Sequence, residues 1–124
     1  MSYDVDLRID TGAPDPAVVV ELGNYTSNVA GMYVLAFTHA GLPYRVAPYS
    51  CAGSLANLHD MPAPEAVPYL ERALAHMDDP KNATRYEAMN PSNKWGNFEG
   101  AKAFLHGILD GCRTHPKTVV RVSW

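Results

Sequence analysis

Two short polar segments contain residue types that could bind a small ligand. The first is an unbroken row of hydrogen-bonding side chains: Asn24, Tyr25, Thr26, Ser27 and Asn28. It lies between an apolar run and a second apolar stretch with helical spacing, so we expect it to lead into a helix start. Free N–H groups and the positive dipole end at such a start can hold a phosphate, a carboxylate or a polar ring. The alternative interpretation is helix capping, for which one or two of these side chains suffice.

The second polar segment, residues 90–100, also leads into an expected helix. Within it, Trp95 could stack on a base or another ring while the adjacent Lys94 meets an anion. Asn93 and Asn97 add further hydrogen-bonding groups, and Asn97 can also cap the helix. The alternative interpretation is structural, with Trp95 filling the edge of the core beside the helix cap.

No catalytic or metal-binding motif accompanies these segments. The sequence contains no nucleophile elbow, no P-loop and no Rossmann fingerprint. His39, His76 and His115 fall near expected helix ends, where a cation complements the helix dipole, and no histidine pair has metal-ligand spacing. Cys51 and Cys112 also fit no metal spacing, and we expect both to be free thiols. We therefore expect a non-enzymatic protein with no metal, no cofactor and no catalytic residues.

Composition and charge exclude several classes of partner. The chain has 124 residues, of which 47% are hydrophobic, which favours a single domain over residues 1–124 with a core of its own. The formal net charge is −3 and no run of Lys or Arg occurs, which argues against extended nucleic-acid binding. No apolar run approaches the roughly 18 residues of a membrane span. The amino terminus lacks the features of a signal peptide, so we expect a cytoplasmic protein.

The hydrophobic pattern predicts the elements that must position the two polar segments. Apolar and polar residues alternate in the expected strands, and apolar residues recur every three or four positions in the expected helices. Strands are expected at residues 3–10, 17–22 and 117–124, and helices at 29–40, about 64–76 and 97–114, with a short helix around residue 85. Residues 42–61 are expected to form a long loop or insertion with one helical turn near Leu55.

This order, ββα(α)αβ, predicts an α+β fold. We expect a three-stranded, mostly antiparallel sheet with about three helices packed on one face and the last strand beside the first. The expected core consists of Val5, Leu7, Val19, Met32, Phe37, Leu70, Leu105, Ile108 and Val120.

Three stretches together resemble one group of proteins. They are residues 4–12 (Asp-Val-Asp-Leu-Arg-Ile-Asp-Thr-Gly), residues 23–28 (Gly-Asn-Tyr-Thr-Ser-Asn) and residues 90–100 (Asn-Pro-Ser-Asn-Lys-Trp-Gly-Asn-Phe-Glu-Gly). As a set they resemble small proteins of unassigned role encoded by bacteriophages of actinobacteria. The resemblance implies a phage origin and the host-cell cytoplasm as the setting, and it implies no reaction.

The functional hypothesis combines the two polar segments. If both helix starts converge, Trp95 forms a stacking wall and Lys94, with Arg8 or Arg121, supplies positive charge. The expected ligand is a small polar molecule, plausibly a nucleotide-type host signal that is sequestered as counter-defence, and a homo-oligomer could complete the pocket. The alternative is a structural or interaction protein, a virion component or an inhibitor of a host protein. Its expected contact surface is an apolar patch on the long loop, built from Tyr44, Tyr49 and Leu55.

Overall fold

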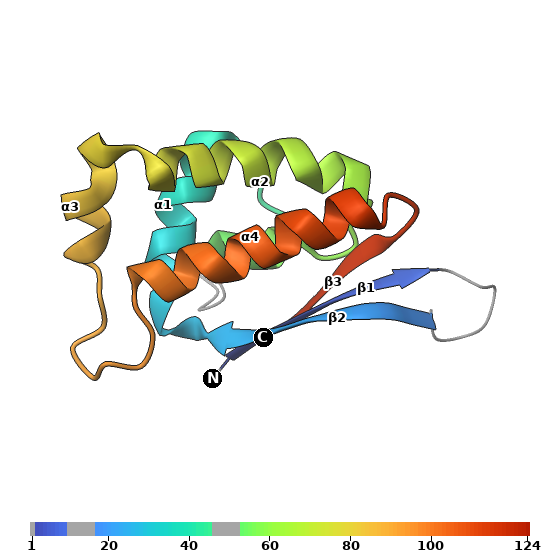
Figure 1. The fold of residues 1–124 in the computed structure, drawn as a ribbon, viewed down its shortest axis with the longest axis horizontal. Coiled ribbons are helices and arrows are strands. Elements are labelled where there is room, and N and C mark those ends of the chain that lie inside the picture. Colours follow the sequence, from blue (N-terminus) through green and yellow to red (C-terminus); the bar gives the residue numbers. More distant parts are fainter. Residues whose placement is uncertain (1, 10–16, 46–52) are drawn as a thin grey trace.

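The computed structural model describes residues 2–9, 17–45 and 53–124, apart from the side chains of residues 18, 19, 53 and 54 (Figure 1). The strands are β1 (Ser2–Ile9), β2 (Ala17–Thr26) and β3 (Val119–Ser123). The α-helices are α1 (Ala30–Ala40), α2 (Ala63–Asp78), α3 (Ala83–Glu87) and α4 (Phe98–Thr114). Short 3-10 turns are η1 (Ser27–Val29), η2 (Gly53–Leu58) and η3 (Pro80–Asn82). The expected turn at residues 11–16 lies outside the described residues.

The strands form one antiparallel sheet in the order β2-β1-β3. Tyr3, Val5 and Leu7 of the central strand are fully buried, because alternate side chains of a strand share one face. Figure 1 shows α1, α2 and α4 together on one side of the sheet. The expected α+β class, the antiparallel sheet and the position of the last strand beside the first are therefore confirmed.

Strand β2 continues through part of the first polar segment, and here the expected boundary at residue 22 is wrong. Asn24, Tyr25 and Thr26 pair with β1, and the strand ends at Thr26. The register shifts between Val5 and Asp6, where the β2 partners change from Gly23 to Glu21. Backbone pairing does not depend on apolar side chains, so a polar row can extend a strand as readily as it can start a helix.

The segment before α2 belongs to the core and to the sheet edge. The helical turn expected near Leu55 is present as η2, but Leu55, Leu58 and Met61 are buried rather than exposed. The backbone then covers the outer edge of β3, with Asp60 N–H donating to Val120 O at 2.8 Å and Val120 N–H donating to Met61 O at 2.9 Å. Leu55 therefore cannot belong to an exposed apolar patch, and Tyr49 lies outside the described residues.

The helices match their sequence signals closely. Gly41, with φ of 80°, ends α1 in the left-handed conformation that glycine adopts easily. The side chain of Asn97 caps α4 by accepting a hydrogen bond from Gly100 N–H at 2.7 Å. Pro68 lies inside α2 rather than in its first turn. The following members of the expected core are buried: Val5, Leu7, Met32, Phe37, Leu70, Leu105, Ile108 and Val120.

The expected free thiol is present at Cys112, which is buried on α4. Cys51 lies outside the described residues, and so does the side chain of Val19. Ile9, at the end of β1, is 39% exposed, although its position in the alternation matches that of the buried Leu7. In the described ranges, no helix combines the length and apolarity required to span a membrane.

Candidate functional site

The two polar segments meet at one end of the molecule. The hydroxyl of Tyr25, on β2, accepts a hydrogen bond from the backbone N–H of Asn97 at 3.0 Å. The Tyr25 ring also lies near Phe104 of α4, with the ring centroids 5.9 Å apart. The end of β2, rather than the start of a helix, therefore lies against the start of α4.

Two glycines make this close approach possible. Gly96 has φ of 92°, and a β-carbon there would collide with the side chain of Thr26 and lie 3.2 Å from Val29. At Gly100 a β-carbon would collide with the hydroxyl of Tyr25. Only residues without a side chain allow the loop before α4 to contact β2 in this way.

Several polar groups of the two segments stabilise local turns. The Thr26 hydroxyl accepts a hydrogen bond from Asn28 N–H at 3.3 Å, and the Asn93 side chain accepts one from Trp95 N–H at 3.0 Å. Asn97 caps α4, and the η1 turn, Ser27–Val29, separates Thr26 from α1. Capping and turn formation, the alternative interpretation, therefore account for the acceptor groups of Thr26, Asn93 and Asn97.

Trp95 is the largest exposed side chain of the junction. It is 70% exposed, so the alternative in which it fills the edge of the core is wrong. Lys94, just before it, has φ of 63°, an uncommon conformation for a residue with a side chain. The loop therefore presents an aromatic face to solvent with one cation beside it.

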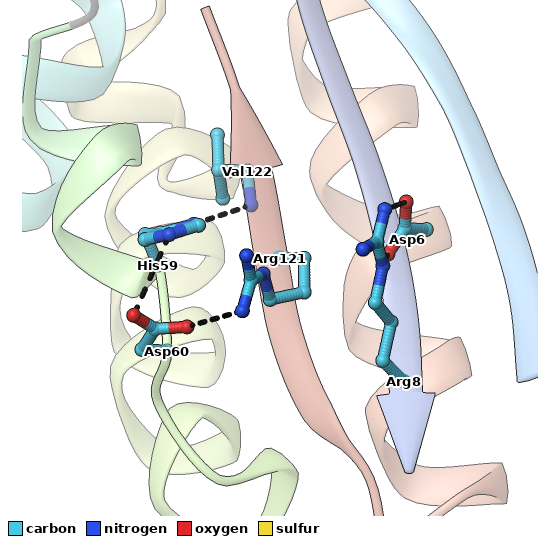
Figure 2. A network of polar contacts seen from close by, with 6 residues as sticks. All are labelled: Asp6, Arg8, His59, Asp60, Arg121 and Val122. Carbon is cyan, nitrogen blue, oxygen red and sulfur yellow. Dashed lines mark hydrogen bonds and ion pairs between the residues drawn. The ribbon is translucent and has the colours of Figure 1, made fainter. Parts of the chain in front are cut away.

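The two arginines expected to add charge are engaged elsewhere, on the sheet and its edge (Figure 2). The Arg8 guanidinium pairs with Asp6, with Nε 2.8 Å from Oδ1, and Arg121 pairs with Asp60 at 3.1 Å. Beside them, the Nδ1 atom of His59 accepts a hydrogen bond from Val122 N–H at 3.0 Å. The contacts of Arg121 and Val122 attach the segment before α2 to the edge of β3, whereas the Arg8–Asp6 pair lies within β1.

The hollows beside the junction are acidic. One, of about 200 Å³, is lined by Glu87, Asn90, Asn97, Phe98 and Glu99. Another, of about 170 Å³ on the sheet, is lined by Asp4, Val5, Asp6, Glu21, Gly23 and Asn24. Carboxylates repel anions, so both hollows disfavour ligands with several phosphates.

His39 and His76 form a histidine cluster away from the junction, and the sequence did not predict their contact. The rings of His39 and His76 lie 4.1 Å apart between centroids, and both line a hollow of about 450 Å³. Nδ1 of His76 lies 2.6 Å from the hydroxyl of Tyr86. Burial, followed by His39 and Arg85, lowers the pKa of His76. Both histidines do lie in the last turns of their helices, as expected, but only packing brings the two helix ends together.

The junction and the histidine pair both present groups that can contact a ligand. In the part of the chain that the structure describes, no group of three or more His, Cys, Asp or Glu side chains is placed to hold a metal ion. The junction offers an aromatic face, amide groups and one lysine, and the histidine cluster offers nitrogen donors. No protein-family model, curated protein or solved structure matches this chain, so its function must be inferred from its own geometry.

Proposed function

We propose that this protein binds a small polar ligand, without chemical conversion, on the exposed face of Trp95 at the junction of β2 and α4. The observation that carries the proposal is the hydrogen bond of 3.0 Å between the Tyr25 hydroxyl and Asn97 N–H. It joins two polar segments that are about 70 residues apart in sequence into one surface. The surrounding segments, Asn24–Asn28 and Asn93–Asn97, supply hydrogen-bonding groups on either side.

The ligand best suited to this surface is a flat ring with few negative charges. Stacking of one base on an aromatic side chain contributes about 1–3 kcal/mol. Each neutral hydrogen bond adds about 0.5–1.5 kcal/mol, so a stack with two or three such bonds contributes about 2–7.5 kcal/mol, a range that includes the roughly 4.1 kcal/mol of a 1 mM Kd. Lys94 can meet one phosphate, whereas Glu87 and Glu99 in the adjacent hollow oppose further negative charge. Nucleobases, nucleosides and nucleotides with one phosphate therefore fit better than polyphosphates.

The biological role that we propose follows from the resemblance to small proteins of actinobacteriophages. A phage protein that binds without converting its ligand would act in the host cytoplasm by sequestration. We propose a nucleotide-type host signal as the sequestered molecule and counter-defence as the outcome.

Fluorescence provides a direct test because the chain contains two tryptophans. Trp124→Phe leaves Trp95 as the single tryptophan, so a ring that stacks on it quenches the remaining emission. Nucleobases, nucleosides and mono-, di- and cyclic nucleotides are titrated into this variant. Saturable quenching by at least one of them is expected, and a complete absence of quenching contradicts the proposal.

Thermal unfolding supplies the matched comparison. A ligand at 100 times its Kd raises the free energy of unfolding by about 2.7 kcal/mol, which is visible as a higher melting temperature. Trp95→Ala is expected to remove this shift, whereas Trp124→Ala, at the other exposed tryptophan, keeps it. Equal shifts in both variants exclude Trp95 as the binding surface.

A second candidate function, an interaction with a host protein or a virion component, is favoured by the same exposed aromatic residue. Trp95 is 70% exposed and Tyr44 is 58% exposed, and aromatic side chains are enriched at protein interfaces. Proteomics of purified particles tests the virion role. Affinity capture of a single identified host protein by the parent chain, lost in Trp95→Ala and kept in Trp124→Ala, supports the inhibitor role.

A further inference from the structure

The carboxyl ends of α1 and α2 enclose a hollow whose lining is rich in nitrogen donors. The hollow measures about 450 Å³ and is lined by His39, Arg72, Ala75, His76, Asp79 and Asn82. It is separate from the junction at Trp95, because it uses none of the residues of either polar segment. The sequence offers no sign of it, since His39 belongs to α1 and the other lining residues belong to α2, η3 and the residue between them, Asp79.

Contacts with the backbone hold two of the donor side chains in place. Arg72 donates from Nε to the carbonyl of Ala40 at 3.1 Å, and its guanidinium carbon lies 5.1 Å from the Tyr69 ring centroid. Among the described residues, the terminal nitrogens of this guanidinium have no protein partner. Asn82 donates from its amide nitrogen to His76 O at 3.0 Å. The contact through Nε therefore orients Arg72 at the hollow and leaves the N–H groups of its two terminal nitrogens available.

The contact with Tyr86 is compatible with a neutral His76 that carries its proton on Nε2. Burial raises the pKa of the Tyr86 hydroxyl to about 12, so this group is protonated and can donate to Nδ1 of His76 at 2.6 Å. A neutral imidazole that accepts at Nδ1 carries its proton on Nε2. In this tautomer His76 presents an N–H donor on the side of the ring away from Tyr86.

The charged groups around the pair are of both signs, with Arg72 and Asp79 in the lining of the hollow and Arg85 close to His76. His76 is in ring contact with His39 and within the electrostatic range of Arg85, and Arg72 lines the same hollow. Asp79 is the carboxylate of the lining, and its side chain already accepts a hydrogen bond from Lys81 N–H at 3.0 Å. Two imidazoles in contact repel each other when both are protonated, and a bound anion removes this penalty.

We propose that this hollow binds a compact phosphoryl group through Arg72, His39 and His76. Three nitrogen donors from two helices match the several oxygens of a phosphate better than the two oxygens of a carboxylate. A metal ion is a poor fit, because among the described residues no group of three or more His, Cys, Asp or Glu side chains is placed to coordinate one.

Inorganic phosphate is the first probe, with the histidine ring signals of the intact chain followed by NMR. Saturable shifts are expected for His39 and His76 and not for His106 and His115, which lie outside the hollow. Phosphate is also expected to raise the pKa of His76, since binding and protonation favour each other. No saturable shift, or equal shifts of all four histidines, overturns the proposal. Acetate at the same ionic strength is expected to give weaker shifts, and equal response to acetate overturns the phosphoryl preference.

Arg72→Gln is the decisive variant and Arg113→Gln is its charge-matched control. Arg113 pairs with Glu71 instead of lining the hollow. The first change is expected to weaken phosphate binding at least tenfold, equivalent to about 1.4 kcal/mol, and the second to leave it unchanged. Equal affinity in both variants overturns the assignment. His39→Gln replaces an exposed side chain, so it tests the same site even if Arg72→Gln impairs folding.

Two further experiments identify the source of the phosphoryl group and test whether this site is independent of Trp95. Tighter binding of a sugar monophosphate than of inorganic phosphate indicates a metabolite, and equal binding indicates the free ion; each agrees with a phosphoryl site. Trp95→Ala is expected to leave phosphate binding intact, and loss of binding in that variant contradicts an independent site.

Discussion

The hydroxyl of Tyr25, on β2, occupies the space that a side chain at Gly100 of α4 would need. The same hydroxyl accepts a hydrogen bond from Asn97 N–H, so the contact is both a close packing and a polar link. This relationship joins the end of the sheet to the start of the best-defined helix. It also explains why a glycine is present in the first turn of α4, where alanine would otherwise favour helix formation.

Replacement of Gly100 by alanine is therefore expected to destabilise the protein. The new methyl group collides with Tyr25, and such overpacking costs about 1–3 kcal/mol. Gly107, in the same helix, has open space around its missing β-carbon, so Gly107→Ala is expected to stabilise by about 0.5–1 kcal/mol. Urea unfolding of both variants measures the difference, and a gain in stability from Gly100→Ala would show that Tyr25 does not lie there.

Tyr86→Phe tests the link between Tyr86 and the histidine pair. The Tyr86 ring stacks on Phe98, with centroids 4.8 Å apart and planes 2° from parallel, and phenylalanine retains this stack. The hydroxyl is lost, and with it the hydrogen bond to His76, which costs about 0.5–1.5 kcal/mol. Tyr44→Phe, at a tyrosine that is 58% exposed, is the control and is expected to be neutral. Equal urea midpoints for the two variants would refute the proposed hydrogen bond.

The stability of the protein is expected to decrease in acid because of His76. Its pKa is lowered by burial first, and then by His39 and Arg85. The unfolded chain therefore binds a proton more readily than the folded one. The contribution of neutral His76 is fully present above an unfolded pKa of about 6.5 and is lost as the pH falls toward the lower folded value.

His76→Gln provides the comparison for this pH dependence. The urea midpoint of the parent chain is expected to fall more steeply than that of the variant as the pH drops from about 7.5 to about 5. The His76 ring signal in a direct NMR titration is expected to have its midpoint below about 6.5. A midpoint above that value would contradict the assignment.

Cys112 is expected to resist alkylation in the folded protein. Burial raises the pKa of its thiol to about 11, and the thiolate is the reactive form. Iodoacetamide at mildly alkaline pH, followed by mass spectrometry of the peptide that contains residue 112, measures the modification. The same peptide reacts in denaturant, which serves as the control, and rapid reaction without denaturant would show that the thiol is accessible.

Local signals were sufficient for most of the fold because they need no distant partner. The alternation of apolar and polar residues correctly predicted that Val5 and Leu7 lie on the buried face of β1. It also predicted that Val120 lies on the buried face of β3. The side-chain oxygen of Asn97 caps α4, and the group that donates to it, Gly100 N–H, is only three residues further along the chain. Such patterns are visible in a single short stretch of chain.

Where a residue depends on a distant partner, the sequence-based expectation was wrong. The end of β2 extends to Thr26 because β1 supplies pairing partners as far as Ser2. Leu55 is buried because the segment before α2 packs into the core and onto the edge of β3. The residues around Leu55 in the sequence resemble those of a loop. Trp95 is exposed, and Thr26 and Tyr25 occupy the space beside the following residue, Gly96.

The sequence by itself determined the α+β class, the strand and helix phases and the two polar segments. Only the tertiary structure decided that Tyr25 meets Asn97, and that His39 meets His76 at the ends of two helices. The physical reason is the range of the interactions. Hydrogen-bond ladders, caps and amphipathic stripes act over a few residues, whereas a binding surface is assembled by packing between elements that are far apart along the chain.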